Sequence, residues 1–120
     1  MRTLVIGDIH GGLRALHQIL ERAKVGLNDK LIFLGDYVDG WSQSPQVIDY
    51  LIELKTTHNC ICILGNHDLH LLAIDAGLRK TKGLDTVEPI LSAPDRAELI
   101  DWLRKRPMAL SNGKVLTVHA

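Results

Sequence analysis

The sequence repeats one pattern, in the segments Val5-Ile6-Gly7-Asp8, Phe33-Leu34-Gly35-Asp36 and Ile63-Leu64-Gly65-Asn66. In each segment an apolar run ends at a glycine, and a side chain that bears oxygen follows directly. The apolar runs at 2–6, 31–34 and 60–64 have the length of short buried strands. Helical periodicity follows them, at 11–24, from Ser44 onward and at 67–76. Strands that alternate with amphipathic helices predict an α/β fold with a parallel βαβαβ core, buried on both faces.

Local signals predict where further elements begin and end. Ser44 is expected to cap the second helix, with Pro45 in its first turn. The segment Asp95-Arg-Ala-Glu98 resembles a capping box, and the fourth helix that it opens must end before Pro107. The segment Ser111-Asn-Gly-Lys114 predicts a hairpin between apolar residues 108–110 and 115–118.

The three strand ends carry the candidate functional groups. Right-handed crossovers place the carboxyl ends of parallel strands at one edge, where ligands bind in open α/β sheets. We therefore expect Asp8, Asp36 and Asn66 to lie together, and histidines His10 and His67 follow two of them. Glycine allows the backbone to turn sharply and approach closely there. A single such pair is explained equally well by turn chemistry and a helix cap, but the set of three with its histidines indicates a ligand site.

The types of side chain at this edge indicate a metal. Oxygen and nitrogen ligands without thiolate suit Mn, Fe or Zn. Asp36 comes from the middle of the three sites, so it is the natural carboxylate to bridge two ions about 3.5–4 Å apart. Such a pair of ions activates a shared water and stabilises an in-line displacement at phosphorus. The sequence thus predicts metal-dependent hydrolysis of a phosphoester.

Three motifs resemble those of the calcineurin-like metallophosphoesterases, the superfamily of the serine/threonine protein phosphatases: Gly7-Asp-Ile-His-Gly11, Gly35-Asp-Tyr-Val-Asp39 and Gly65-Asn-His-Asp68. The resemblance implies that residues 1–120 form the N-terminal part of a β-sandwich domain flanked by helices. It also implies two divalent ions (Mn, Fe, Zn or Co, with Mn favoured). By this resemblance, Asp8 and His10 would bind one ion, Asn66 and His119 would bind the other, and Asp36 would bridge the two. His67 would protonate the leaving oxygen, and Asp39 would orient His67.

The second half of the chain is more particular. The segments 65–73, 92–95 and 101–104 are similar to a bacterial branch of this family, the symmetrical diadenosine tetraphosphatases, whereas 35–44 looks closer to other bacterial phosphatase-like members. The resemblance implies a small substrate, a dinucleoside polyphosphate that is cleaved to ADP. Two alternatives stay open. One is a phosphomonoesterase of the protein phosphatase type that acts on phosphoproteins, and the other is a noncatalytic remnant that keeps only the metal-binding edge.

The sequence departs from the family pattern in two ways. Where the family has an arginine shortly after the second-motif aspartate, Gly40 and Trp41 follow Asp39, so bidentate recognition of phosphate is missing at that place. Trp41 could stack on a base or only cover the site. Other cations could come from a segment that we interpret as a solvated basic loop: Arg79, Lys80 and Lys82.

Length is the second departure, because family members are considerably longer than 120 residues. We therefore expect a truncated domain, with an incomplete shell around the second metal and a sheet face without its cover. Such a chain should bind metal weakly, self-associate through the uncovered face and turn over slowly.

Composition narrows the functional classes further. The 14 Lys and Arg balance the 14 Asp and Glu, so no net field recruits nucleic acid or an anionic membrane. The apolar runs are too short for a transmembrane helix or a signal peptide. Cys60 and Cys62 are two positions apart on one strand, near the far limit for a disulfide, so we expect free core cysteines in a reduced, cytoplasmic protein.

Overall fold

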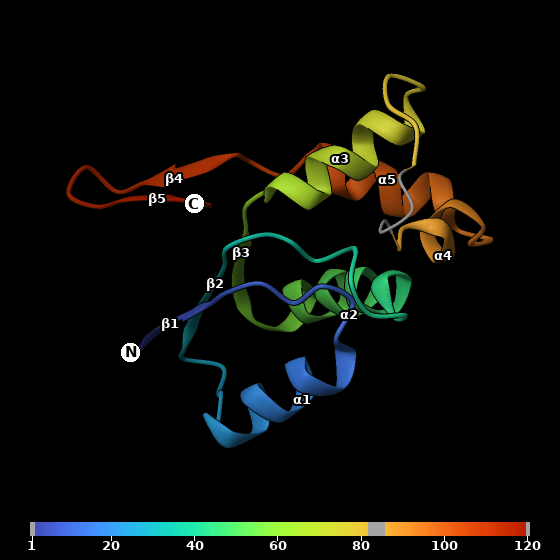
Figure 1. Cartoon of the computed structure of the whole chain (residues 1–120). Helices are drawn as coiled ribbons and strands as arrows, with labels where there is room; N and C mark the ends of the chain where they lie inside the picture. The colour runs from blue at the N-terminus through green and yellow to red at the C-terminus, as the bar shows by residue number, and fades with distance from the viewer. Residues whose placement is uncertain (1, 82–85, 120) are drawn as a thin grey trace.

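In a computed structural model of the chain, residues 2–81 and 86–119 are described (Figure 1). They form β1 (Thr3–Ile6), α1 (Leu13–Arg22), β2 (Lys30–Phe33), α2 (Ser44–Thr57), β3 (Asn59–Cys62), α3 (Asn66–Asp75), α4 (Glu88–Leu91), α5 (Arg96–Arg104), β4 (Ala109–Ser111) and β5 (Leu116–Val118).

The first three strands form the predicted parallel sheet, in the order β1-β2-β3. Thr3 pairs with Lys30 and Lys30 pairs with Asn59, so the strands are in register and all end at the same edge. The second strand is central, as the placement of Asp36 between the other two sites requires. Strands β4 and β5 form the predicted antiparallel hairpin, which projects from the body of the molecule in Figure 1.

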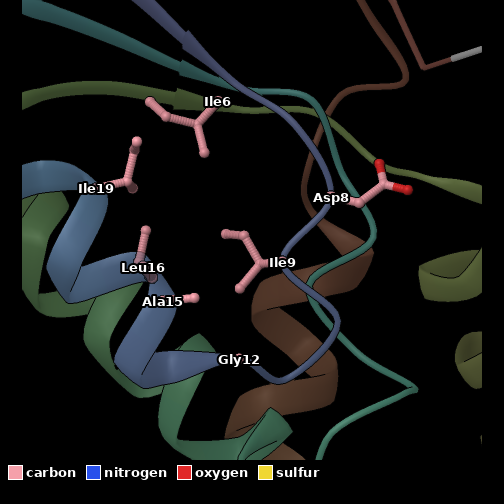
Figure 2. Close-up of a pocket in the computed structure, with 7 residues that line it drawn as sticks. All are labelled: Ile6, Asp8, Ile9, Gly12, Ala15, Leu16 and Ile19. Atoms are coloured by element: carbon pink, nitrogen blue, oxygen red, sulfur yellow. The ribbon is translucent and has the colours of Figure 1, made fainter.

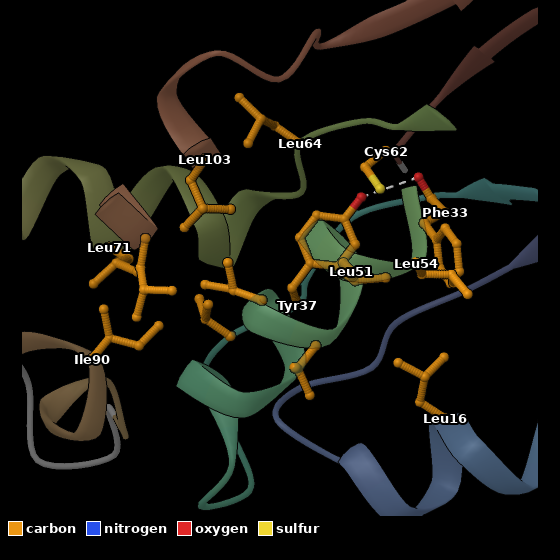
Figure 3. Packing of buried hydrophobic residues seen from close by; sticks show 14 of the residues in the cluster. Leu16, Phe33, Tyr37, Leu51, Leu54, Cys62, Leu64, Leu71, Ile90 and Leu103 are labelled. Carbon is orange, nitrogen blue, oxygen red and sulfur yellow. Dashed lines mark hydrogen bonds between the residues drawn. The ribbon is translucent and has the colours of Figure 1, made fainter. Parts of the chain in front are cut away.

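The core lies between the sheet and the helices, and Figure 3 shows its packing. Leu31 and Phe33 of β2 are fully buried in a cluster with residues of α2, α3 and α5. Tyr37, just beyond β2, is also fully buried, and its hydroxyl donates to the backbone oxygen of Ile63, 2.6 Å away. This bond joins the segment after β2 to the segment after β3, which stabilises the edge where the candidate ligands lie.

The first strand is more exposed than predicted. Leu4 and Ile6 pack against the core, but Val5, on the opposite face, is 57% exposed. The prediction that the sheet is buried on both faces is therefore wrong at β1. The physical reason is that, among the described residues, no element covers the face that carries Val5.

Two predicted helix caps are also wrong. Ser44 is the first residue of α2, which is capped by Gln43 without a side-chain hydrogen bond. The Ser44 hydroxyl instead accepts a hydrogen bond from the backbone N–H of Asp39, 3.2 Å away. Asp95 does stand at the start of α5, but its side chain makes no capping bond, so the predicted capping box does not form. The short helix α4 was not predicted from the sequence.

Close backbone contact explains the glycine at two of the three strand ends. A Cβ on Gly35, whose φ is +104°, would lie 2.3 Å from the Gly65 nitrogen, and a Cβ on Gly65 would lie 2.2 Å from Asp36 Oδ1. Any side chain at either place would therefore collide with its neighbour. Gly7 differs, because a Cβ there would meet nothing within 4 Å. The prediction that glycine allows close approach of the backbone is therefore confirmed after β2 and β3 and is wrong after β1.

The predictions about cysteines and membranes have a structural counterpart. Cys60 and Cys62 are free and buried, as predicted, and burial raises the pKa of the Cys62 thiol to about 12. Among the described residues, each helix is too short or too polar to cross a bilayer.

Candidate metal centre

The loops after β1 and β2 are bonded directly to each other. The backbone N–H groups of Ile9 and His10 both donate to the backbone oxygen of Asp36, at 3.0 and 2.8 Å. The backbone is left-handed at His10, Asp36 and Asp39, with φ of +49°, +57° and +68°. Each left-handed residue other than glycine costs on the order of 1 kcal/mol, so the fold holds a strained backbone where the candidate ligands lie.

Asp68 connects the end of β2 to the start of α3. Its fully buried carboxylate accepts backbone N–H bonds from Asp36 (2.8 Å), Gly65 (2.9 Å) and Tyr37 (3.0 Å). Burial raises the pKa of Asp68 to about 6, and the three hydrogen bonds act in the opposite direction. Asp68 lies in the third motif, but sequence reasoning gave it no role. Its contacts show that it fixes the position of the Asp36 backbone.

Asp36 stands at the centre of the candidate site. Its Oδ2 lies 3.6 Å from His10 Nε2 and 3.4 Å from His119 Nε2, and its side chain is 3% exposed. Its Oδ1 accepts the backbone N–H of His67 at 2.9 Å. The half-exposed carboxylate of Asp8 lies beside both histidines, with Oδ2 3.3 Å from His10 Nε2 and Oδ1 3.9 Å from His119 Nδ1. One oxygen of Asp36 is therefore shared between two imidazoles.

The tautomers of His10 and His119 follow from their carbonyl partners. His10 Nδ1 lies 3.1 Å from the Val38 oxygen and His119 Nδ1 lies 2.9 Å from the Leu34 oxygen. A carbonyl only accepts, so each Nδ1 must donate its hydrogen, and each Nε2 then faces the site. His119 Nε2 lies 2.9 Å from Asn66 Oδ1, which also only accepts. Nitrogen and oxygen lone pairs that converge in this way need a cation or a proton between them, so the donor set fits a divalent metal.

The groups around His10 raise its pKa. Partial burial acts to lower this pKa, but the hydrogen bond to Val38 and the negative charges of Asp36 and Asp8 outweigh burial and raise it. The imidazole therefore attracts a positive charge at its Nε2, and a bound metal ion would have to displace a proton there.

The candidate ligands fall into two compact groups that share Asp36. In each group the possible ligand atoms lie within 4.8 Å of one another; the groups are Asp8, Asp36 and His119, and His10, Asp36 and His67. The structure thus brings together all the residues that sequence reasoning selected as metal ligands. It also brings His67 close to His10, with ring centroids 5.0 Å apart. The division of ligands between two ions, with Asp8 beside His10, stays a prediction.

His67 differs from the other two histidines in its partner. Its Nδ1 lies 2.9 Å from Oδ2 of Asp39, the pair that sequence reasoning placed together. The other oxygen of Asp39 accepts bonds from the N–H and the hydroxyl of Thr86, at 2.5 and 2.7 Å. Burial acts to raise the pKa of Asp39, but the bonds from Thr86 and His67 prevail and lower it. Asp39 is therefore an ionised acceptor that holds the His67 ring.

Sequence reasoning missed Thr86. It lies 47 positions after Asp39, outside every motif and outside any periodic segment, so no signal in a single sequence marks it. Its hydroxyl also accepts the backbone N–H of Gly40. Through these contacts Thr86 fixes both the carboxylate of Asp39 and the loop that follows it.

A cavity of about 300 Å³ lies over the His67–Asp39 pair. It is lined by His10, Asp39, Gly40, Trp41, His67 and Thr86. Neither Arg79 nor Lys80 is among the described residues that line it, and Lys82 lies outside the described residues. This cavity is therefore open to a ligand beside the candidate metal ligands, and of the predicted basic loop neither described residue, Arg79 or Lys80, lines it.

A second hollow of about 310 Å³ lies between the end of β1 and α1. Figure 2 shows that its lining is almost wholly apolar and that the Asp8 carboxylate points away from the apolar side chains. The hollow therefore presents no converging set of ligand atoms, and Asp8 belongs to the candidate metal centre.

Comparison with known proteins agrees with this geometry. The chain matches the family model of the calcineurin-like phosphoesterases over residues 1–120. It is 44% identical over 109 residues to the symmetrical bis(5'-nucleosyl)-tetraphosphatase of Thioalkalivibrio sulfidiphilus, a match that covers 90% of this chain and 40% of that protein. It is 42% identical to the protein of the same name from Janthinobacterium sp., over 100% of this chain and 43% of that one.

Solved structures share the fold. A crystal structure of a proposed diadenosine tetraphosphatase superposes with a TM-score of 0.78 at 26% identity, over 98% of this chain and 49% of that one. The chain spans about two fifths of the length of the curated relatives it matches. The family match over the whole chain and the identity to these relatives show that the chain belongs to the calcineurin-like phosphoesterase family.

Proposed function

We propose that this chain provides the dinuclear metal site of a phosphohydrolase that cleaves diadenosine tetraphosphate symmetrically, with water, into two molecules of ADP. One observation carries the proposal: Oδ2 of Asp36 lies within 3.6 Å of Nε2 of both His10 and His119. Both nitrogens face the carboxylate because each Nδ1 donates to a carbonyl. The names of the two bacterial relatives support the choice of substrate.

The residues would divide between two ions that share Asp36. Asp8 and His10 would complete one group, and Asn66 and His119 the other, all within one domain that includes residues 1–120. Oxygen and imidazole ligands suit Mn, Fe, Zn or Co, and the family resemblance leads us to favour Mn²⁺, in a reduced, cytoplasmic setting. When bound, such a pair supplies an activated water and neutralises charge on the phosphate.

His67 would protonate the departing ADP. With Nδ1 engaged by Asp39, its Nε2 is left to carry the proton that passes to the leaving oxygen as the bond from phosphorus to that oxygen breaks. The ionised carboxylate of Asp39 keeps the ring in one orientation and stabilises the imidazolium. The cavity over this pair gives the phosphate chain a place to lie.

The test compares three substrates with the purified chain in Mn²⁺: diadenosine tetraphosphate, a phosphopeptide and p-nitrophenyl phosphate. We expect ADP as the product of the first substrate, and loss of activity in Asp36→Asn, which removes the shared charge. Glu53→Gln serves as the matched control, because it makes the same acid-to-amide change at an exposed position of α2.

Other outcomes would contradict the proposal. ATP and AMP as products would exclude symmetrical cleavage, and faster hydrolysis of the phosphopeptide would favour a protein phosphatase. Metal binding without turnover of any of the three substrates would favour a noncatalytic role.

A further inference from the structure

The Trp41 side chain is unusually exposed for its size and lies beside the candidate site. It is 72% exposed, although large aromatic side chains are mostly buried. It lines the cavity of about 300 Å³ together with His67 and Asp39. An exposed indole next to the group that would protonate a leaving oxygen is placed to contact a substrate.

The backbone that carries this indole is held firmly. The N–H of Trp41 donates to the backbone oxygen of His10, 2.7 Å away, and the N–H of Gly40 donates to the Thr86 hydroxyl. Both partners belong to, or directly support, the candidate site. The indole is therefore exposed because of where the loop presents it, and the loop that carries it is fixed relative to the candidate ligands.

A second cavity shares Trp41 as a lining residue. It measures about 380 Å³, and Trp41 lines it together with Arg14 and Gln18 of α1. Both of these side chains are exposed and can donate hydrogen bonds. Trp41 thus borders both the hollow with His67 and a second hollow that has polar and cationic groups on its wall.

We propose that Trp41 is a stacking platform for a purine base of the substrate. This proposal rests on the proposed function, because a dinucleoside polyphosphate carries a base that is tethered to the scissile phosphate by a short flexible chain. An indole face binds a base through stacking, which does not require hydrogen bonds to the polar atoms of the base. The platform also explains why Trp41 stands near the place where the family pattern has an arginine. The arginine would bind phosphate there, whereas Trp41 would bind a base.

The kinetic test uses Trp41→Ala and Trp41→Phe. Loss of one stacked base weakens binding about 5- to 150-fold, so we expect Trp41→Ala to raise the KM for diadenosine tetraphosphate by that factor with little change in kcat. Trp41→Phe keeps an aromatic face, so its KM should lie between those of the wild type and Trp41→Ala. Inorganic tripolyphosphate, which lacks a base, should be hydrolysed equally well by all three proteins. An unchanged KM in Trp41→Ala would overturn the platform and leave the proposed function intact.

A binding test separates the platform from catalysis. In Trp102→Phe the only indole is Trp41, so its fluorescence reports on this site alone. We expect saturable quenching by ADP and none by tripolyphosphate, whether or not the protein hydrolyses diadenosine tetraphosphate. Equal responses to ADP and tripolyphosphate, or no response to either, would overturn the platform.

Discussion

At the scale of single residues, the partner of Nδ1 separates the histidines of the site. His10 and His119 donate to carbonyl oxygens, whereas His67 contacts the carboxylate of Asp39. A carbonyl partner at Nδ1 leaves the Nε2 lone pair of His10 and His119 to face the site, whereas the ionised Asp39 carboxylate holds the His67 ring. We therefore expect these histidines to differ in role according to the partner of Nδ1.

His67→Ala tests the general acid. We expect kcat to fall about 10²- to 10⁴-fold with diadenosine tetraphosphate. The fall should be larger for phenyl phosphate than for p-nitrophenyl phosphate, because the more basic leaving oxygen depends more on protonation. Metal content should stay the same, and His17→Ala on the exposed face of α1 is the control. A loss that is equal for both aryl phosphates, or loss of metal, would assign His67 a different role.

Thr86→Val tests the support of Asp39. Valine has nearly the shape of threonine but lacks the hydroxyl that donates to Asp39 Oδ1 at 2.7 Å. We expect kcat to fall about 10- to 150-fold, as for loss of one hydrogen bond to a charged group, with KM unchanged. Thr86→Ser restores the hydroxyl and should restore most of the rate. If serine were no better than valine, the hydroxyl would have no positioning role.

The same variant should alter acid stability. The pKa of Asp39 is below its ordinary value of 3.8, so its contribution to stability is complete above that value and is lost as the pH falls further. Thr86→Val raises the folded-state pKa toward 3.8. The difference in free energy of unfolding between wild type and Thr86→Val should therefore be greatest near pH 7 and shrink below about pH 4. Urea denaturation across this pH range measures it, and a constant difference would contradict the assignment.

At the scale of elements, the strand ends act as one unit. The loop after β1 is bonded to Asp36, and Asp68 at the start of α3 holds the backbone of Asp36 and Tyr37. The contact between Gly35 and Gly65 lets the segments after β2 and β3 approach this closely. The candidate ligands are thus positioned by backbone contacts between loops.

Alanine substitutions at the strand ends check this interpretation. Gly65→Ala would place a Cβ 2.2 Å from Asp36 Oδ1, so we expect loss of metal binding and a destabilisation of several kcal/mol. Gly7→Ala makes the same change after β1, where a Cβ meets nothing within 4 Å, and should change stability by less than about 1 kcal/mol. Thermal denaturation and metal titration measure both. Equal effects of the two variants would show that the close contact is unimportant.

Sequence reasoning succeeded where periodicity and topology decide the structure. Parallel strands must end at one edge, which predicted the meeting of Asp8, Asp36 and Asn66. It failed where long-range contacts decide. Ser44 contacts the backbone of Asp39 and does not cap α2, and Thr86 reaches Asp39 from an irregular segment. The exposure of Val5 depends on whether another element covers that face of the sheet, and local patterns do not contain that information.

At the scale of the whole molecule, apolar side chains lie exposed on the hairpin and on β1. Leu116 is 67% exposed, Val118 is 48% exposed and Val5 is 57% exposed. Exposed apolar surface of this kind favours association. The self-association expected from the sequence stays a prediction, and these residues indicate where to test it.

Leu116→Glu should reduce concentration-dependent association, because a charge on the hairpin opposes burial of this surface. Leu27→Glu is the matched control, since Leu27 is 71% exposed but lies outside the hairpin. Sedimentation velocity at several concentrations measures the effect. If the wild-type chain is monomeric throughout, or if both variants act alike, the hairpin is not the surface through which copies associate.

The position of His119 has a consequence for biosynthesis. Its ring meets Asn66, 53 positions earlier, and Leu34, 85 positions earlier. On the ribosome, Asp8, His10, Asp36 and Asn66 are therefore translated before His119. An ion that met the nascent chain at that stage would find these candidate ligands without the His119 imidazole. If the proposed site holds an ion, we expect it to be held more tightly once His119 has left the exit tunnel.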